Sequence, residues 1–304
     1  MVKVLVTDPV EVEKLDLGPG FDVDYRPSAS RDEVLSVVHD CEVLVVRSRT
    51  KVDRELIDRA PKLRLVARPG TGLDNVDVGY AKSRGVEVLN SPESLVEAVA
   101  EHVVLLMLAL SRKLAPADQS TRAGRWEKGT IMGRELKGKV LGIVGLGRIG
   151  RRIAELADAM GMSILAYDVV PIPPDVAASL GVRVVGLDDV FSGSDYVTLH
   201  VPLTDETRHL VGRERLASMK RGACLVNTSR GGVVDEQALA SALSDGALGG
   251  AALDVFEKEP PSGAILSAPN TVLTPHIGGQ TEEAQADAIA VVGEKVRRFF
   301  TQGS

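Results

Sequence analysis

A glycine-rich segment, GLGRIG at 145–150, has the spacing of a turn that can approach phosphate groups. It follows an apolar run and opens a stretch with helical periodicity, so the turn joins a strand to a helix. Gly145 permits the tight turn, Gly147 lets a pyrophosphate come close to the backbone, and Gly150 lets the helix pack on the strand. Amides at the helix start would hold the anion. The segment predicts a dinucleotide site, with a purely structural turn as the alternative.

An acidic residue, Asp168, ends the next predicted strand, 18 residues beyond Gly150. A carboxylate about 20 residues after the glycine motif binds the adenosine ribose in dinucleotide sites. It accepts hydrogen bonds from both ribose hydroxyls and repels a 2′-phosphate. The residues that follow, VVPIPP, contain no arginine to neutralise such a phosphate. NAD is therefore predicted as the cofactor in preference to NADP.

Three polar side chains in the second half have types suited to chemistry beside a nicotinamide ring. Arg230 lies in NTSRGGVVDE, Glu259 in DVFEKEP and His276 in LTPHIGG. Hydride transfer from a hydroxy acid needs an acid/base group and a cation that orients the substrate. Arg230 and His276 each follow a predicted strand, at the edge where open α/β sheets bind ligands. Their types and spacing alone do not select these three, because single histidines and arginines are more often structural.

The elements that must position these residues form two sets of short Val/Leu/Ile-rich runs that alternate with helical patterns, as in parallel sheets. A helical stretch at about 94–114, with Pro92 ahead of it and Pro116 after it, separates the sets. Ser30 and Glu33 form a capping box that opens an earlier helix. The predicted strands are 2–7, 22–25, 42–46, 63–67 and 86–90 in the first set, and 140–145, 163–168, 182–185, 196–200, 224–227, 251–255 and 271–275 in the second.

The composition limits the classes of function. A chain of 304 residues, 44% hydrophobic, is long enough for two domains. A net charge of -6 argues against a general surface for nucleic acid or anionic membrane. The longest apolar run, at 103–110, is far shorter than the roughly 20 residues that span a bilayer, and the N-terminus lacks a signal-peptide pattern, so a cytoplasmic protein is expected. Cys41 and Cys224 are expected to be buried thiols, with no metal site.

Taken together, the motifs make the chain resemble the D-isomer-specific 2-hydroxyacid dehydrogenase family. The resemblance runs from about residue 41 to residue 285, through VVRSRTKV, VARPGTGLDNVD, GRWEKGTIMGRELKGKVLGIVGLGRIGR, NTSRGGVVDE, AALDVFEKEP and LTPHIGGQTEEAQ. It implies an α/β fold of two doubly wound parallel-sheet domains. Residues 94–280 would form a Rossmann NAD-binding domain, and residues 1–93 with 281–304 a flavodoxin-like substrate-binding domain.

The resemblance also implies roles for single residues. Arg230 would bind the substrate carboxylate and carbonyl, His276 would be the acid/base, and Glu259 would hydrogen-bond to His276. Asp254 would bind the nicotinamide carboxamide. For His200, at the strand end that borders the adenine, a structural role stays as open as a direct contact. The cofactor-binding residues expected are Gly145, Gly147, Arg148, Ile149, Gly150, Asp168, His200, Pro202, Thr228, Asp254 and Gly278.

Within the family, the chain is most similar to the branch that oxidises 3-phosphoglycerate to 3-phosphohydroxypyruvate at the entry to serine synthesis. Arg47 and Arg68 correspond to two arginines that hold the substrate phosphate in that branch. Lys128 corresponds to a further basic position, which can come from the neighbouring subunit. The alternative is that these cations pair with surface acids such as Glu42 and bind no substrate.

Other expectations come from the same resemblance. The amides of Thr71 and Gly72 in RPGTG would bind the substrate carboxylate. Glu97 departs from the small polar residue usual near the substrate, which leaves a glyoxylate or hydroxypyruvate reductase as an alternative. A non-enzymatic NAD-sensing corepressor is a third candidate, since such proteins share the scaffold. A homodimer is implied, built on the helix near 94–114 and the arm through Trp126. The chain ends about 20 residues after the resemblance fades, so no C-terminal regulatory domain is expected.

Overall fold

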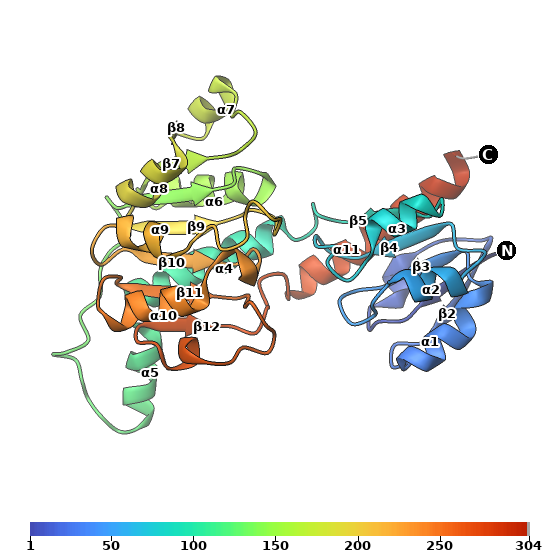
Figure 1. The fold of residues 1–304 in the computed structure, drawn as a ribbon, viewed down its shortest axis with the longest axis horizontal. Helices are drawn as coiled ribbons and strands as arrows, with labels where there is room; N and C mark the ends of the chain where they lie inside the picture. Colours follow the sequence, from blue (N-terminus) through green and yellow to red (C-terminus); the bar gives the residue numbers. More distant parts are fainter. Residues whose placement is uncertain (303–304) are drawn as a thin grey trace. The chain divides into compact units, whose positions relative to one another are not determined.

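The computed structural model describes residues 1–302 and divides the chain into two compact units (Figure 1). Unit 1 comprises Met1–Val96 together with the chain from Gly279 onward, and unit 2 comprises Glu97–Gly278. Each unit is built on one parallel sheet. The predicted fold class, two parallel-sheet α/β units, is therefore confirmed.

Unit 1 has a five-stranded sheet with the order β2-β1-β3-β4-β5, the flavodoxin-like arrangement. The predicted capping box is present, since the Glu33 amide donates to Ser30 Oγ at 3.3 Å and the Ser30 amide donates to Glu33 Oε2 at 2.7 Å. The elements are β1 (Val2–Val6), η1 (Val12–Leu15), β2 (Phe21–Tyr25), α1 (Arg31–Val37), η2 (Val38–Asp40), β3 (Val43–Val45), α2 (Arg54–Arg59), β4 (Leu65–Arg68), α3 (Val78–Ser83), β5 (Glu87–Asn90) and α11 (Glu282–Gln302).

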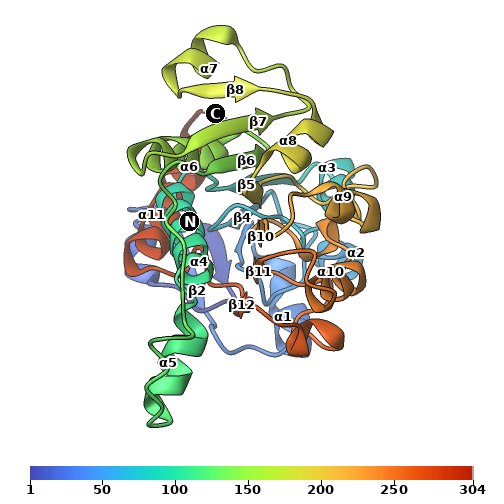
Figure 2. The same ribbon diagram turned by 90° about the vertical axis from the view of Figure 1, so that its left-hand side faces the viewer.

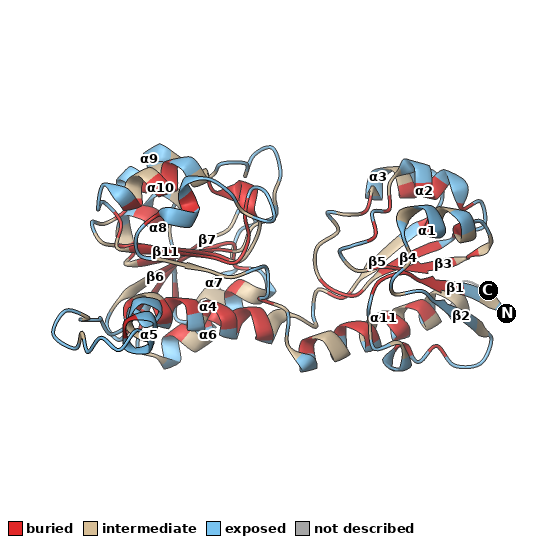
Figure 3. Ribbon diagram, turned by 90° about the horizontal axis from the view of Figure 1, so that it is seen from below, coloured by how far each residue is buried: buried red, intermediate tan, exposed pale blue. Residues whose placement is uncertain are grey.

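The sheet of unit 1 has an apolar core on each face, where helices pack against it. One core joins the sheet to α1, α2 and α3. The other joins it to η1 and α11, through residues that include Leu15, Ile289 and Val292. Figure 3 shows α11 on the side of this sheet opposite α1, α2 and α3. The last helix therefore completes the unit in which the chain begins.

Unit 2 has a seven-stranded sheet with the order β12-β11-β10-β9-β6-β7-β8. The order reverses between β6 and β9, as in Rossmann folds, and ligands bind such sheets at the carboxyl ends of the strands around that point. The strands are β6 (Val140–Val144), β7 (Ser163–Tyr167), β8 (Val182–Val184), β9 (Tyr196–Leu199), β10 (Cys224–Asn227), β11 (Gly250–Leu253) and β12 (Thr271–Leu273).

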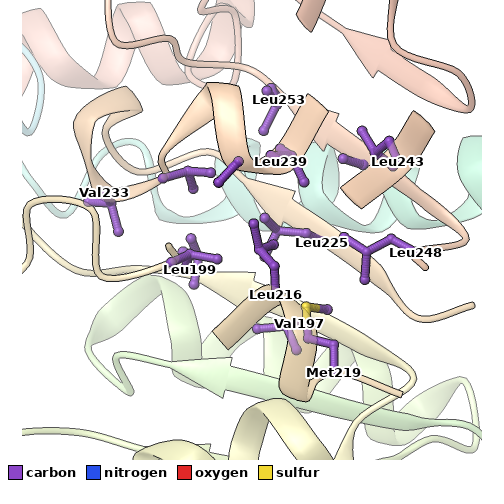
Figure 4. Close-up of a cluster of buried hydrophobic side chains, with 14 of the residues drawn as sticks. Val197, Leu199, Leu216, Met219, Leu225, Val233, Leu239, Leu243, Leu248 and Leu253 are labelled. Carbon is purple, nitrogen blue, oxygen red and sulfur yellow. The ribbon is translucent and has the colours of Figure 1, made fainter. Parts of the chain in front are cut away.

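Helices cover both faces of the unit 2 sheet, with α4 and α6 on one side and α8, α9 and α10 on the other (Figure 2). Figure 4 shows the apolar core between this sheet and α8, α9 and α10, in which side chains such as Leu199, Leu225 and Leu239 pack together. These helices and turns are α4 (Val96–Ser111), α5 (Leu114–Arg122), α6 (Arg148–Ala159), α7 (Pro174–Ser179), α8 (Leu187–Gly193), α9 (Arg213–Ser218), η3 (Gly231–Val233), α10 (Glu236–Ser244) and η4 (Ala264–Ser267).

The helical stretch expected at about 94–114 is α4, which ends at Ser111, and a second helix, α5, begins at Leu114, where none was expected. Lys113 separates them in a left-handed conformation, with φ 50°. Pro116 lies in the first turn of α5 instead of beyond the helix end. A proline is tolerated there because the first amides of a helix have no partner within the helix.

Both cysteines are buried and free. Burial raises the pKa of the Cys41 thiol to about 12 and that of Cys224 to about 11, so both thiols stay protonated at neutral pH. No helix among the described residues is long and apolar enough to cross a membrane. Within residues 1–302 there is also no group of three or more His, Cys, Asp or Glu side chains suited to a metal ion.

Candidate active site

The GLGRIG segment forms the turn between β6 and the start of α6. Gly145 has φ 97°, and a Cβ at this position would lie 2.4 Å from the His200 carbonyl oxygen, so the turn depends on glycine. A Cβ at Gly150 would lie 2.2 Å from the Gly145 carbonyl oxygen. Around Gly147, by contrast, no described residue other than its two neighbours in the chain comes within 4 Å of a built Cβ, and no side chain caps the helix. Open space above uncapped amides fits a pyrophosphate.

Asp168 follows β7 and is tied to the glycine turn. Its Oδ2 accepts a hydrogen bond from the Leu146 amide at 2.7 Å, and its Oδ1 accepts one from the Val170 amide at 2.9 Å. A carboxylate has about four acceptor positions, so each oxygen keeps capacity for a ribose hydroxyl. The residues of the turn and of Asp168 thus fit the adenosine end of NAD.

His276 and Glu259 form a hydrogen-bonded pair. His276 Nδ1 lies 3.1 Å from Glu259 Oε1 and 3.0 Å from Oε2. The carboxylate only accepts, so Nδ1 carries the hydrogen and Nε2 is the nitrogen available to a ligand. About half of each side chain is exposed, at 52% for His276 and 43% for Glu259. The pair can therefore meet a substrate from solvent, with the ring orientation set by Glu259.

Asp254, directly after β11, shapes the turn that carries His276. Its buried carboxylate accepts hydrogen bonds from the amides of Ile277 and Gly278, both at 2.8 Å, and from Thr274 Oγ1 at 2.6 Å. Burial acts to raise the pKa of Asp254, but hydrogen bonds from His102, Thr274 and the two amides outweigh it, so the pKa lies below its usual value. His276 has φ 56°, a conformation that costs a non-glycine residue roughly 1–2 kcal/mol. Asp254 thus stabilises a strained turn.

Arg230 lies just after β10, beside the segment that carries Glu259. Its carbonyl oxygen accepts from Asn227 Nδ2 at 2.9 Å, and its Nη1 donates to the Ser229 carbonyl at 2.6 Å. A Cβ on Gly231 would lie 1.8 Å from the Phe256 carbonyl carbon, so the two backbone segments touch at this glycine. Sequence reasoning missed Gly231, although the pair of glycines after Arg230 was a visible signal.

The remaining cofactor candidates lie at the same edge of the unit 2 sheet. Thr228 Oγ1 is buried without a hydrogen-bond partner among residues 1–302, which marks it as a donor for a ligand. Burial lowers the pKa of His200 to about 3, and its Nε2 lies 2.8 Å from Thr198 Oγ1, so the neutral ring is held within the fold. That contact favours the structural role for His200. Arg148 and Ile149 are in the first turn of α6, Pro202 is exposed after β9, and Gly278 contacts Asp254.

In unit 1, Arg47 follows β3 and lines a cavity of about 290 Å³ with Tyr25, Pro69 and Gln285 among its walls. Burial lowers the pKa of Arg47, and the nearby Asp8 acts in the opposite direction. The buried Asp8 carboxylate accepts from the Arg47 amide at 2.7 Å and so fixes the start of its loop. Sequence reasoning missed Asp8.

The RPGTG segment, which begins at the last residue of β4, is anchored to β5 and the segment that follows it. The Gly70 amide donates to Ser91 Oγ at 2.8 Å, and Asn90 Nδ2 donates to the Thr71 carbonyl at 2.6 Å. A Cβ on Gly70 would lie 2.2 Å from Arg68 Nη1, so the guanidinium group folds over this loop. Thr71 Oγ1 and Ser94 Oγ are buried without hydrogen-bond partners in the described part of the chain. Ser94 was not among the predicted residues, and Gly72 directly follows Thr71 in the loop.

Two further residues singled out in the sequence lie in unit 2. Lys128 is on an exposed segment between α5 and β6. Glu97 forms a bidentate ion pair with Arg152 of α6, at 2.7 and 2.8 Å, which lowers the pKa of Glu97. The unusual carboxylate is thus held by a helix of its own unit. Glu42, the acid considered as a partner for the arginines, contacts Arg64 at 3.6 Å.

Comparison with known proteins gives a consistent result. Residues 104–278 match the model of the D-isomer specific 2-hydroxyacid dehydrogenase, NAD binding domain. A D-3-phosphoglycerate dehydrogenase of Methanocaldococcus jannaschii is 44% identical over 303 residues, covering 99% of this chain and 58% of that protein. A hydroxypyruvate reductase of Thermotoga maritima is 46% identical over 300 residues, covering 97% of each.

A solved structure also resembles this chain in its fold. The D-lactate dehydrogenase from Aquifex aeolicus, complexed with NAD and lactic acid, superposes with a TM-score of 0.86 at 31% identity, covering 98% of this chain and 96% of that one. The chain spans about half the length of several phosphoglycerate dehydrogenases that it matches.

Proposed function

Because the chain belongs to the D-isomer-specific 2-hydroxyacid dehydrogenase family, with the family's NAD-binding domain at residues 104–278, we propose that it oxidises 3-phosphoglycerate to 3-phosphohydroxypyruvate with NAD. This would place it at the entry to serine synthesis. The observation that carries the proposal is the His276–Glu259 pair, which extends from the same sheet as the glycine turn. A pair of this kind supplies an acid/base group next to a dinucleotide.

The chemistry assigns one role to each of three side chains. Bound NAD supplies the hydride acceptor for C2 of the hydroxy acid. His276 Nε2 takes the proton of the C2 hydroxyl, while Glu259 holds the hydrogen on Nδ1 and keeps the ring in place. Arg230 binds the substrate carboxylate and the oxygen on C2 through its planar guanidinium group. In the reverse direction the protonated His276 returns the proton to the same oxygen.

The cofactor is held by the glycine turn, by Asp168 and by Thr228 in this proposal. The turn supplies amides to the pyrophosphate, and Asp168 supplies acceptors to the ribose. Asp254 Oδ2 accepts one hydrogen bond among the described residues, from the Gly278 amide, and so can accept another. That oxygen is the acceptor proposed for the nicotinamide carboxamide.

A test of cofactor choice follows from Asp168. Asp168→Ala is expected to raise the KM for NAD roughly 10- to 100-fold, because it removes a charge-assisted acceptor, and to improve the relative use of NADP. Initial rates with both cofactors measure this, with Asp175→Ala, an exposed acid in α7, as the matched control. Comparable use of NAD and NADP by the unaltered protein would contradict the role of Asp168.

The phosphate of the substrate is assigned to Arg47 and Arg68. Arg47 lines the cavity of unit 1, and Arg68 lies over the loop whose Thr71 and Gly72 amides are proposed to bind the substrate carboxylate. Thr71 Oγ1, buried without a partner in residues 1–302, adds a donor there. Lys128 is proposed as a further cation from a neighbouring subunit. A phosphate needs such paired cations, whereas a simple hydroxy acid does not.

The two arginines can be tested by substrate comparison. Arg47→Ala and Arg68→Ala are each expected to raise the KM for 3-phosphoglycerate roughly 10- to 100-fold, since a hydrogen bond to a charged group contributes about 1.5–3 kcal/mol. Rates with hydroxypyruvate and glyoxylate should change much less. Arg59→Ala, an exposed arginine of α2, is the control.

Equal losses on phosphorylated and unphosphorylated substrates would instead favour the second candidate function, hydroxypyruvate reduction. That candidate is supported by the Thermotoga maritima relative, which matches 97% of each chain. The deciding experiment measures kcat/KM for 3-phosphoglycerate with NAD and for hydroxypyruvate and glyoxylate with NADH. The kcat/KM for 3-phosphoglycerate with NAD should be the highest of the three.

We also propose a homodimer whose interface covers the exposed apolar side chains of α4 and of the arm, which is the segment between α5 and β6 that contains Trp126. Leu105 and Leu108 of α4 are 52% and 38% exposed, Leu114 is 53% exposed, and Trp126 and Met132 of the arm are 83% and 78% exposed. Apolar side chains gathered on one helix and its arm favour a symmetric contact. Sedimentation at micromolar concentration should give a dimer, and Leu105→Glu with Leu108→Glu should give a monomer. A monomeric unaltered protein would refute the dimer.

A further inference from the structure

A buried histidine of α4, His102, contacts the residues that hold the His276 turn, and the chemistry proposed above gives it no role. The side chain is 9% exposed. Its Nε2 lies 3.2 Å from Thr274 Oγ1 and 3.4 Å from Asp254 Oδ1. Thr274 directly follows β12 and Asp254 directly follows β11, so the contact joins α4 to the carboxyl ends of these two strands.

The direction of these hydrogen bonds is fixed by the single hydrogen of Thr274. The Thr274 hydroxyl lies 2.6 Å from Asp254 Oδ1, and a carboxylate only accepts, so the hydroxyl hydrogen goes to Asp254. Thr274 Oγ1 can then only accept from His102, which means that Nε2 of His102 carries a hydrogen. His102 is thus a donor to the pair formed by Thr274 and Asp254.

That pair in turn holds the backbone on both sides of His276. The Asp254 oxygens accept from the amides of Ile277 and Gly278, the two residues after His276. On the other side, the His276 amide donates to the Thr274 carbonyl at 3.0 Å. His276 itself has φ 56°, so its conformation depends on neighbours that hold it. A shift of Asp254 or Thr274 would therefore move the imidazole.

We propose that His102 is a positioning residue for His276, acting through Thr274 and Asp254. The proposal rests on the proposed function, in which His276 moves the substrate proton. The N–H at Nε2 of His102 donates to Thr274 Oγ1 and so keeps the Thr274 hydroxyl hydrogen directed at Asp254. The Asp254 carboxylate, oriented in this way, holds the turn that carries His276. A chain of hydrogen bonds thus runs from α4 to the acid/base group.

Two alternative roles for His102 would have different consequences. If His102 only fills space in the core, a donor at Nε2 has no importance, and an apolar residue of similar size would serve. If His102 acts only by aligning Asp254 with the nicotinamide carboxamide, its loss would raise the KM for NAD and spare kcat. The positioning role predicts a loss in kcat that is much larger than any change in the KM for NAD.

The test compares His102→Leu with His102→Gln, since the glutamine amide can place an N–H where Nε2 lies. His102→Leu is expected to lower kcat about 10- to 100-fold, the effect of misplacing a catalytic group by a fraction of an ångström to about 1 Å. The KM for NAD should change much less than kcat, and His102→Gln should recover most of kcat. Equal kcat in all three proteins, or a loss confined to the KM for NAD, would overturn the proposal.

A second readout does not depend on turnover. In ¹⁵N-labelled protein, the ring signals of His276, assigned with His276→Ala, should be the same in the unaltered protein and in His102→Gln and should move in His102→Leu. If no 2-hydroxy acid is oxidised, the proposed function fails, but this spectrum still decides the positioning role, and unchanged His276 signals in His102→Leu would overturn it. Should His102→Leu not fold, Thr274→Val breaks the same hydrogen bonds and is expected to give the same changes; wild-type kcat and His276 signals in Thr274→Val would overturn the proposal.

Discussion

His276→Ala is expected to lower kcat for 3-phosphoglycerate by roughly two to four orders of magnitude, the usual contribution of a positioned acid/base group. The substitution removes the nitrogen proposed to take the substrate proton and leaves the glycine turn and Asp168 in place. NAD affinity, measured by calorimetry, should therefore stay close to that of the unaltered protein. A large loss in kcat with unchanged NAD affinity is the result expected for a group that transfers the substrate proton and does not bind the cofactor.

The matched control is His39→Ala, which removes an exposed histidine of unit 1. It should leave kcat unchanged. Near-normal turnover in His276→Ala would remove His276 from the mechanism, whatever its contact with Glu259.

Gly231→Ala is expected to lower kcat/KM by about 100-fold, as a displacement near 1 Å at a reacting group does. The new Cβ would lie 1.8 Å from the Phe256 carbonyl carbon and 2.4 Å from the Glu257 amide nitrogen, so the two backbone segments must separate. Arg230 precedes Gly231, and Glu259 follows Phe256 on the other segment, so the separation moves the proposed substrate cation away from the proposed acid/base pair. Overpacking of this kind also costs about 1–3 kcal/mol of stability.

The control for Gly231→Ala is Gly79→Ala in α3, where, apart from the chain neighbours and the helix backbone, the nearest atom to a built Cβ is Asp77 Oδ1 at 3.8 Å. That variant should keep its activity. Thermal unfolding of both variants separates lost stability from lost geometry. A Gly231→Ala protein with full activity would show that the contact between the two segments does not position Arg230.

The sequence predicted those features that depend on neighbours along the chain. GLGRIG reads as a strand-to-helix turn because its glycines, its strand and its helix are contiguous, and the structure has that turn between β6 and α6. The capping box at Ser30 is local in the same way. The contact between Glu259 and His276 joins residues from two different segments, and it was expected only through the family resemblance.

Features that depend on packing were missed. Nothing near Asp254 in the sequence indicates that its carboxylate accepts from Thr274, Ile277 and Gly278, because these donors come from the next strand and turn. The partner of Glu97 is likewise on another helix, at Arg152. Helix α5 was missed because Pro116 was taken as a terminator, whereas it fits the first turn of a new helix.

The central claim is that the protein transfers a hydride from C2 of a D-2-hydroxy acid to NAD. Its most direct test uses 3-phosphoglycerate deuterated at C2, with hydrazine present to trap the keto product, and mass spectrometry of the cofactor. The predicted result is deuterated NADH from the D isomer and none from the L isomer, with hardly any from His276→Ala in the same time. Deuterium released into water, or no reduced cofactor from 3-phosphoglycerate or any other 2-hydroxy acid, would contradict the claim.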